Sequence, residues 1–147
     1  MTNILSTLQA AIVERLETDE WFSGPVRVPV LSMIEGDIGN KVERLQKRTG
    51  TCVVVDMPMI ERAAEPRRVF VLLSIMVYEN VAYNAKAGTQ RAALDSCMTI
   101  WELLDQWQPA AYWSPLLPQQ IVEVATDPWL VYEVGMLTST VIIASTS

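Results

Sequence analysis

The spacing of hydrophobic residues predicts three helices, over residues 3–18, 36–50 and 90–107. In each segment apolar residues recur every three or four positions, so that they line one face of a helix. These positions are Ile4, Leu8, Ala11, Ile12 and Leu16 in the first helix; Ile38, Val42 and Leu45 in the second; and Ala93, Leu94, Cys97, Trp101 and Leu104 in the third. Asp37 and Thr89 are the expected N-caps of the second and third helices, and Gly50 is the expected end of the second.

The other apolar segments are more continuous and predict strands over 26–33, 51–57, 67–79, 121–125 and 129–143. The segment TCVVVDM, residues 51–57, is apolar at nearly every position and belongs at the centre of a sheet, where both faces are covered. Pro29 has no backbone N–H to donate, which places its strand at a sheet edge. Connections are expected over 58–66, 84–90 and 107–120.

The resulting order is α-β-α-β-β-α-β-β, in which strands and helices do not alternate strictly. This order predicts the α+β class, a mainly antiparallel sheet of about four to five strands with helices packed on one face. A chain of 147 residues is short enough for one hydrophobic core. We therefore expect a single domain over residues 1–147.

The strand over 67–79, RRVFVLLSIMVYE, is unusually long for so small a protein. At about 3.3 Å per residue it spans on the order of 40 Å, and small domains seldom need strands beyond about ten residues. The segment 129–143 has the same excess. Because uncovered extended backbone invites association, the two strands indicate a subunit of an assembly. Glu79 interrupts the apolar run, which suggests that the strand leaves its own core at that point.

Composition excludes several classes of function. Half of the residues are hydrophobic, the net charge is −6 and there is no histidine. The charge disfavours a general nucleic-acid-binding role, and the missing histidine removes Ser-His-Asp and Cys-His catalysis and nearly every zinc site. No apolar run approaches the roughly 18 residues needed to cross a bilayer, and the N-terminus reads as a mature cytosolic one.

Local motifs indicate no cofactor. Cys52 and Cys97 lie in apolar surroundings and are expected to be buried free thiols. The segment GDIGNK, residues 36–41, has neither the glycine spacing nor the Gly-Lys-Ser/Thr ending of a phosphate-binding loop. The basic residues of the second helix form either a solvated face or a contact with an acidic neighbouring subunit. They are Lys41, Arg44, Lys47 and Arg48.

Several carboxylates lie on strands or at strand ends, where paired acids can perform acid–base or metal chemistry. They are Asp56, Glu79, Glu123, Asp127 and Glu133. Nothing in their spacing pairs any two of them. We therefore expect no catalytic residue and no metal site.

The aromatic residues after the third helix have two interpretations, as anchors of the loop and core or as contacts at an interface, where aromatics carry binding energy. Both remain open at this point. The residues selected as subunit-interface candidates are Arg44, Tyr83, Lys86, Arg91, Tyr112, Trp113 and Trp129.

The order of elements and several stretches resemble the tail terminator, or minor tail protein U-like, family of tailed bacteriophages and related contractile particles. The stretches are GDIGNKVERLQKRTGTCVVVDMP, FVLLSIMVYENVAYN, GTQRAALDSCMTIWELLDQWQP and WLVYEVGMLTST. The resemblance extends over nearly the whole chain and rests on patterns of residue type.

This resemblance implies a structural protein without catalysis that forms a ring, usually hexameric, and caps the head-proximal end of the tail tube in the virion. The implied partners are copies of the chain itself, the tail tube protein, a head-completion or neck protein, and a sheath protein if the tail is contractile. DNA would only pass through the channel, and the protein would assemble in the host cytoplasm. Glu79 and Glu133 are the candidate lumen charges.

Other functions are also consistent with the sequence. A neck, tube-adaptor or baseplate component would use a similar fold. A small enzyme or ligand-binding domain would place two of the strand-end carboxylates in one concave pocket. A generic cytosolic adaptor would dimerise through its edge strand.

Overall fold

The computed structural model of the chain describes residues 4–24, 27–32, 38–62, 67–87, 92–127 and 129–141. Helices and strands alternate irregularly along these residues, as the sequence predicts. The helices are α1 (Ile4–Glu17), α2 (Glu20–Ser23), α3 (Ile38–Thr49), α4 (Val81–Ala87) and α5 (Ala93–Leu104). The strands are β1 (Val30–Ser32), β2 (Thr51–Val55), β3 (Met59–Arg62), β4 (Arg68–Glu79), β5 (Leu117–Ala125) and β6 (Leu130–Val141).

All six strands belong to one sheet in the order β1-β2-β4-β6-β5, with β3 paired to β4 beside β2. Only β1 and β2 run parallel, and the remaining pairs are antiparallel. The α+β class is therefore confirmed. β1 pairs with β2 alone, which agrees with the edge position predicted from Pro29, and β2 is buried at all five positions, which agrees with its predicted central place.

The two long strands pair with each other along their whole length, from Arg68 opposite Val141 to Glu79 opposite Leu130. On its other edge, β4 pairs with β2 near its end and with β3 near its beginning. The length of β4 is thus explained within one copy, because a single long strand serves two short partners on one edge. The prediction that strand length alone leaves uncovered backbone is wrong.

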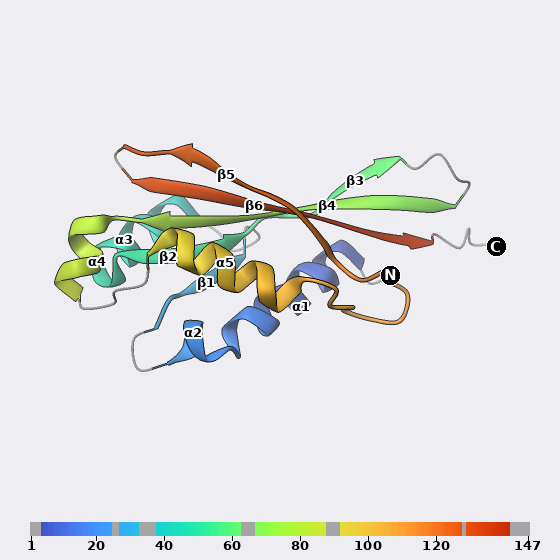
Figure 1. Cartoon of the computed structure of the whole chain (residues 1–147), viewed down its shortest axis with the longest axis horizontal. Coiled ribbons are helices and arrows are strands. Elements are labelled where there is room, and N and C mark those ends of the chain that lie inside the picture. Colours follow the sequence, from blue (N-terminus) through green and yellow to red (C-terminus); the bar gives the residue numbers. More distant parts are fainter. Residues whose placement is uncertain are drawn as a thin grey trace.

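The alternation of burial along β4 separates two faces of the sheet. Val71, Leu73, Ile75 and Val77 are buried and pack in the main core with α1 and α5. The side chains between them point to the opposite face, where α3 contributes Val42 to a smaller cluster. Figure 1 shows α1, α2 and α5 on one side of the sheet. The expectation that helices cover one face therefore holds for these three helices, whereas α3 lies on the other face.

Three segments differ from the sequence prediction. The predicted connection 58–66 contains β3, and β5 begins inside the predicted loop 107–120. Part of the predicted loop 84–90 is α4, which Asn80 initiates by accepting a hydrogen bond from the Tyr83 backbone N–H at 3.2 Å. α5 begins at Ala93, later than predicted, and the expected caps Asp37 and Thr89 lie outside the described residues.

Gly50 joins α3 to β2 in a backbone conformation that residues with a side chain rarely adopt, with φ at 79°. A Cβ atom at this position would overlap the backbone of Asn84. We predict that Gly50→Ala lowers the free energy of unfolding by about 2 kcal/mol or more, because it combines a strained φ with this steric conflict. Urea denaturation measures the loss. The control is Gly135→Ala, whose Cβ would make ordinary contacts with Gln120; an equal loss in both variants would contradict the prediction.

Candidate assembly surface

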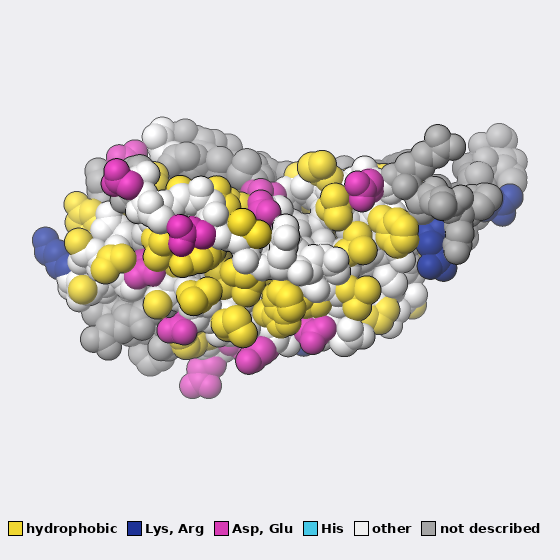
Figure 2. Space-filling model, turned by 45° about the horizontal axis from the view of Figure 1, so that its top comes forward, with side chains coloured by type: hydrophobic (Ala, Val, Ile, Leu, Met, Phe, Trp, Pro, Cys, Tyr) yellow, Lys and Arg dark blue, Asp and Glu magenta, His cyan; other side chains and the backbone are white. Residues whose placement is uncertain are grey.

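Among the described residues, α3 covers the sheet face opposite α1 and α5 at its β1–β2 end, where Val42 packs on Cys52 and Val54. Over β3, β4, β6 and β5, large apolar side chains on this face remain exposed. Met59 is 65% exposed and Leu117 is 44% exposed, and their ladder partners Leu72 and Leu137 share the same face. Figure 2, in which the top of the molecule is turned forward, shows hydrophobic side chains exposed among acidic ones on the surface in view. We call the exposed region over these four strands the open face.

A hollow of about 280 Å³ lies in the open face. Its floor is low because Ser74 of β4 stands opposite Gly135 of β6, so that two small residues meet at its centre. Met57 and Met59 lie at the β3 side, and Gln120 comes from β5. The hollow is therefore built jointly by four segments that are distant in the sequence.

Two carboxylates lie near one hydroxyl in the wall of this hollow. The Ser74 hydroxyl donates a hydrogen bond to Glu133 Oε2 at 2.9 Å, and Asp56 lies within electrostatic reach of both residues. Burial raises the pKa of Asp56, the nearby Ser74 hydroxyl lowers it, and the negative charge of Glu133 raises it, with a net rise. The sequence spacing gave no reason to pair Asp56 with Glu133, yet the register of the sheet brings them together. Their chemistry favours a cation beside apolar groups.

The described residues contain no group of three or more His, Cys, Asp or Glu side chains that is arranged to hold a metal ion. None of the helices in the described ranges is both long enough and apolar enough to span a bilayer. The two cysteines are buried and free, as predicted. Burial raises the pKa of the Cys52 and Cys97 thiols to about 12, so both remain protonated and unreactive near neutral pH.

A second exposed apolar feature lies at one end of the molecule. α4 presents Val81, which is 63% exposed, together with exposed Ala82, Ala85 and Lys86. Tyr83 is half-buried on the same helix. Figure 1 shows α4 at the left end, past the end of β4. α4 is thus a short, mostly apolar projection that carries one lysine.

Glu79 is buried rather than facing a channel, with only 6% of its surface exposed. Its Oε1 accepts a hydrogen bond from the Ala93 backbone N–H at 2.7 Å, and its Oε2 accepts one from Asn84 Nδ2 at 3.0 Å. The N-cap residue of α5, Ala92, makes no side-chain cap bond, so Glu79 supplies the acceptor and the favourable charge at that helix terminus instead. The prediction that Glu79 is a lumen charge is wrong, because the carboxylate joins the end of β4 to α4 and α5.

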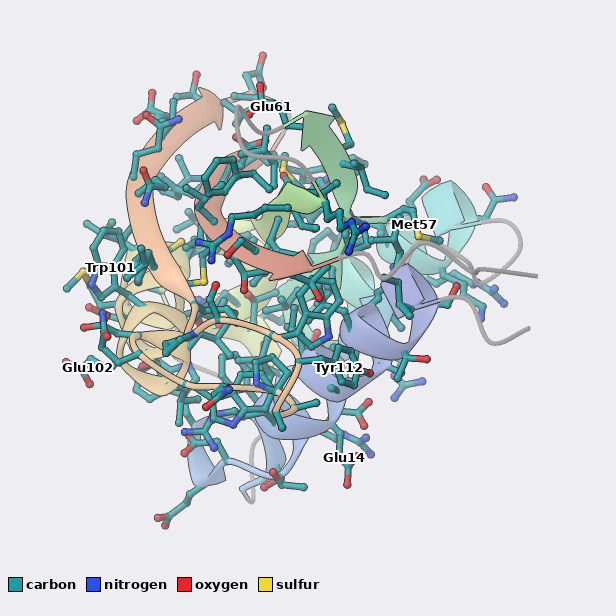
Figure 3. All side chains as sticks on the ribbon, turned by 90° about the vertical axis from the view of Figure 1, so that its right-hand side faces the viewer. Glu14, Met57, Glu61, Trp101, Glu102 and Tyr112 are labelled. Carbon is teal, nitrogen blue, oxygen red and sulfur yellow. The ribbon has the colours of Figure 1, made fainter. Side chains whose placement is uncertain are left out.

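The aromatic loop before β5 divides between core and surface. Trp113 is 2% exposed and belongs to the main core, and its backbone bridges to Thr140 of β6. It is therefore a core anchor, and its selection as an interface residue is wrong. Tyr112 is 50% exposed. Figure 3 shows it at the helix side of the molecule, as Glu14 and Glu102 are, whereas Glu61 lies at the strand side.

The remaining interface candidates come from three different segments of the chain. Arg44 is exposed on α3, on the same helix as exposed Arg48, and Trp129 is half-buried before β6. Arg91 lies outside the described residues. Tyr83 and Lys86 lie together on α4. Arg44 lies on α3, which packs against α4, and Trp129 precedes Leu130, the partner of Glu79 just before α4, whereas Tyr112 lies in the loop before β5. Sequence reasoning missed the open face, although the alternating apolar residues of β4 and the small pair Ser74 and Gly135 contained its signal.

No family model and no curated protein matches this sequence. Solved structures with the same fold do exist. One is a chain of the virion of a native gene transfer agent particle, which matches with a TM-score of 0.57 over 95% of this chain and 99% of that chain, at 14% sequence identity. A second, whose name carries no functional description, matches with a TM-score of 0.54 over 94% of this chain and 96% of that one, at 13% identity. At these identities the likeness establishes the fold.

We predict that Glu79→Ala lowers the free energy of unfolding by about 2–3 kcal/mol, since the buried Ala93 N–H and Asn84 amide lose a charged acceptor. Chemical denaturation measures the loss, and Glu79→Gln, which retains an acceptor oxygen, should lose less. The matched control is Glu102→Ala on the exposed side of α5, which should stay within about 0.5 kcal/mol of the wild type. Equal effects at both positions would contradict the capping role.

The raised pKa of Asp56 predicts a dependence of stability on pH. A carboxyl whose pKa is higher in the folded state contributes stability below its unfolded value of 3.8, and this contribution is lost as the pH rises through the folded value. We expect Asp56→Asn, which does not titrate, to lack this loss. The measurement is the free energy of unfolding of both proteins from pH 3 to pH 7 at one low protein concentration. Parallel curves for the two proteins would contradict it.

Proposed function

We propose that this chain is a structural protein of a phage-like virion, a tail terminator that forms a ring at the head-proximal end of the tail tube. The observation that carries the proposal is the shared fold with a chain of a gene transfer agent virion, since the two match over nearly the full length of both chains. The stretches that resemble the tail terminator family point to the same class of particle.

The exposed surface supports a role in assembly. A single copy leaves apolar side chains uncovered at the open face and at α4, and such patches on soluble proteins mark contact sites. Two different uncovered features on one chain suit a head-to-tail contact, which generates a closed ring when the rotation between neighbours closes. The chemistry at the hollow, two carboxylates and a serine without histidine, favours binding over catalysis.

In this role the chain contacts other copies of itself, the tail tube protein below, a head-completion protein above, and a sheath protein where the tail contracts. DNA passes through the ring and is not retained, which agrees with a net charge of −6.

We predict that particles from which the gene is deleted carry tails of irregular, excessive length that fail to join filled heads, because nothing ends tube polymerisation. Electron microscopy of lysates measures tail length and head attachment, and a plasmid copy of the gene should restore both. In a purified system, adding the protein to polymerising tube protein should shorten the tubes. If particles that lack the protein have tails of normal length and normal infectivity, the proposal is overturned. A complete loss of tubes would assign the chain to tail initiation instead.

A further inference from the structure

The hollow of the open face is apolar in its rim and negative in its wall. Asp56 and Glu133 supply two carboxylates, while the methionines and leucines around them provide no charge. Among the described residues that line the hollow, none is lysine or arginine. A group that fills it must therefore bring a positive charge on an otherwise apolar surface.

The charge distribution of the molecule supplies such a group. In Figure 2, lysine and arginine side chains appear at the two ends of this view and acidic side chains lie between them. The exposed surface of α4 combines a cation, Lys86, with the apolar residues Val81, Ala82 and Ala85. The other end carries Arg67 and Arg68, both exposed, at the beginning of β4. α4 therefore matches the hollow in both properties, apolar character and charge.

The two features suit each other in size as well. α4 has seven residues, and its exposed positions are small except for Val81 and the lysine stem. A hollow with a serine and a glycine at its floor offers room for small side chains from such a helix.

We infer that α4 of one copy docks in the hollow of the next, with Lys86 placed between Asp56 and Glu133 of its neighbour. This contact rests on the proposed ring and specifies the joint between its subunits. It is heterologous, because α4 and the hollow lie at different places on the chain, and repetition of it leads to a closed ring or a filament. It also gives Glu133 a role at the subunit contact in place of the predicted lumen.

The test is a charge exchange followed by light scattering during size-exclusion chromatography. Lys86→Glu and Glu133→Lys should each raise the concentration needed for assembly by about tenfold or more, because each places like charges in contact. The double variant Lys86→Glu/Glu133→Lys should recover most of the assembly. A mixture of the two single variants should also assemble, because every junction pairs opposite charges where the two variants alternate.

The matched control is Arg67→Glu, which makes the same change of charge at the other end of the molecule and should leave assembly unchanged. Thermal unfolding of every variant verifies that the fold is retained. If the wild-type chain assembles and Lys86→Glu and Glu133→Lys assemble equally well, the result would overturn this contact. It would leave the proposed ring intact. Loss of assembly in Arg67→Glu would overturn it in the same way, and a wild-type chain that stays monomeric at every concentration would overturn the ring as well.

Discussion

The structure depends on one pairing, the antiparallel ladder between β4 and β6. Each strand contributes twelve residues, and the register runs without interruption from Arg68 to Glu79. Because side chains alternate across a strand, this register decides in one step which residues face the helices and which face outward. A shift by one residue would move Ile75 and Val77 out of the core and Ser74 into it. The core, the open face and the hollow therefore all follow from the same set of backbone hydrogen bonds.

The hollow arises because two short strands share one edge of β4. β2 ends at Val55, opposite Ile75, and β3 begins at Met59, opposite Leu72. The residues between them pass along β4 near Ser74, and the Asp56 backbone N–H donates a hydrogen bond to the Ser74 carbonyl at 3.0 Å. Because β2 and β3 are interrupted here, the alternation of a continuous strand does not set the direction of the Asp56 side chain. The interruption thus places a carboxyl group beside Ser74. The Asp56 side chain then lies within electrostatic reach of Glu133, which comes from the opposite edge of β4.

Sequence reasoning found the parts whose signal is local and missed those that depend on register. The periodicity of α1 and α5 and the apolar run of β2 were sufficient to place these elements, because burial on one face or on both leaves a repeating pattern. Asp56 and Glu133 are far apart in the chain, and only the β4–β6 ladder brings them together, so spacing could not pair them. Glu79 was read as a residue beyond the core because an acid in an apolar strand normally marks exposure. The compensation that keeps it buried comes from Asn84 and from the Ala93 N–H, a backbone group that carries no sequence signal.

The electrostatics of the hollow support the association between copies that we propose. Burial is the main cause of the raised pKa of Asp56, and the negative charge of Glu133 adds to the rise. A cation from a neighbouring copy would relieve the repulsion between the two carboxylates. Covering the same hollow also removes Met59 and its apolar neighbours from water. In the contact that we propose, apolar burial would supply most of the attraction, while the charges would select which surface enters the hollow. A joint built in this way favours one orientation between neighbours, which is the property that closing a ring of identical subunits requires.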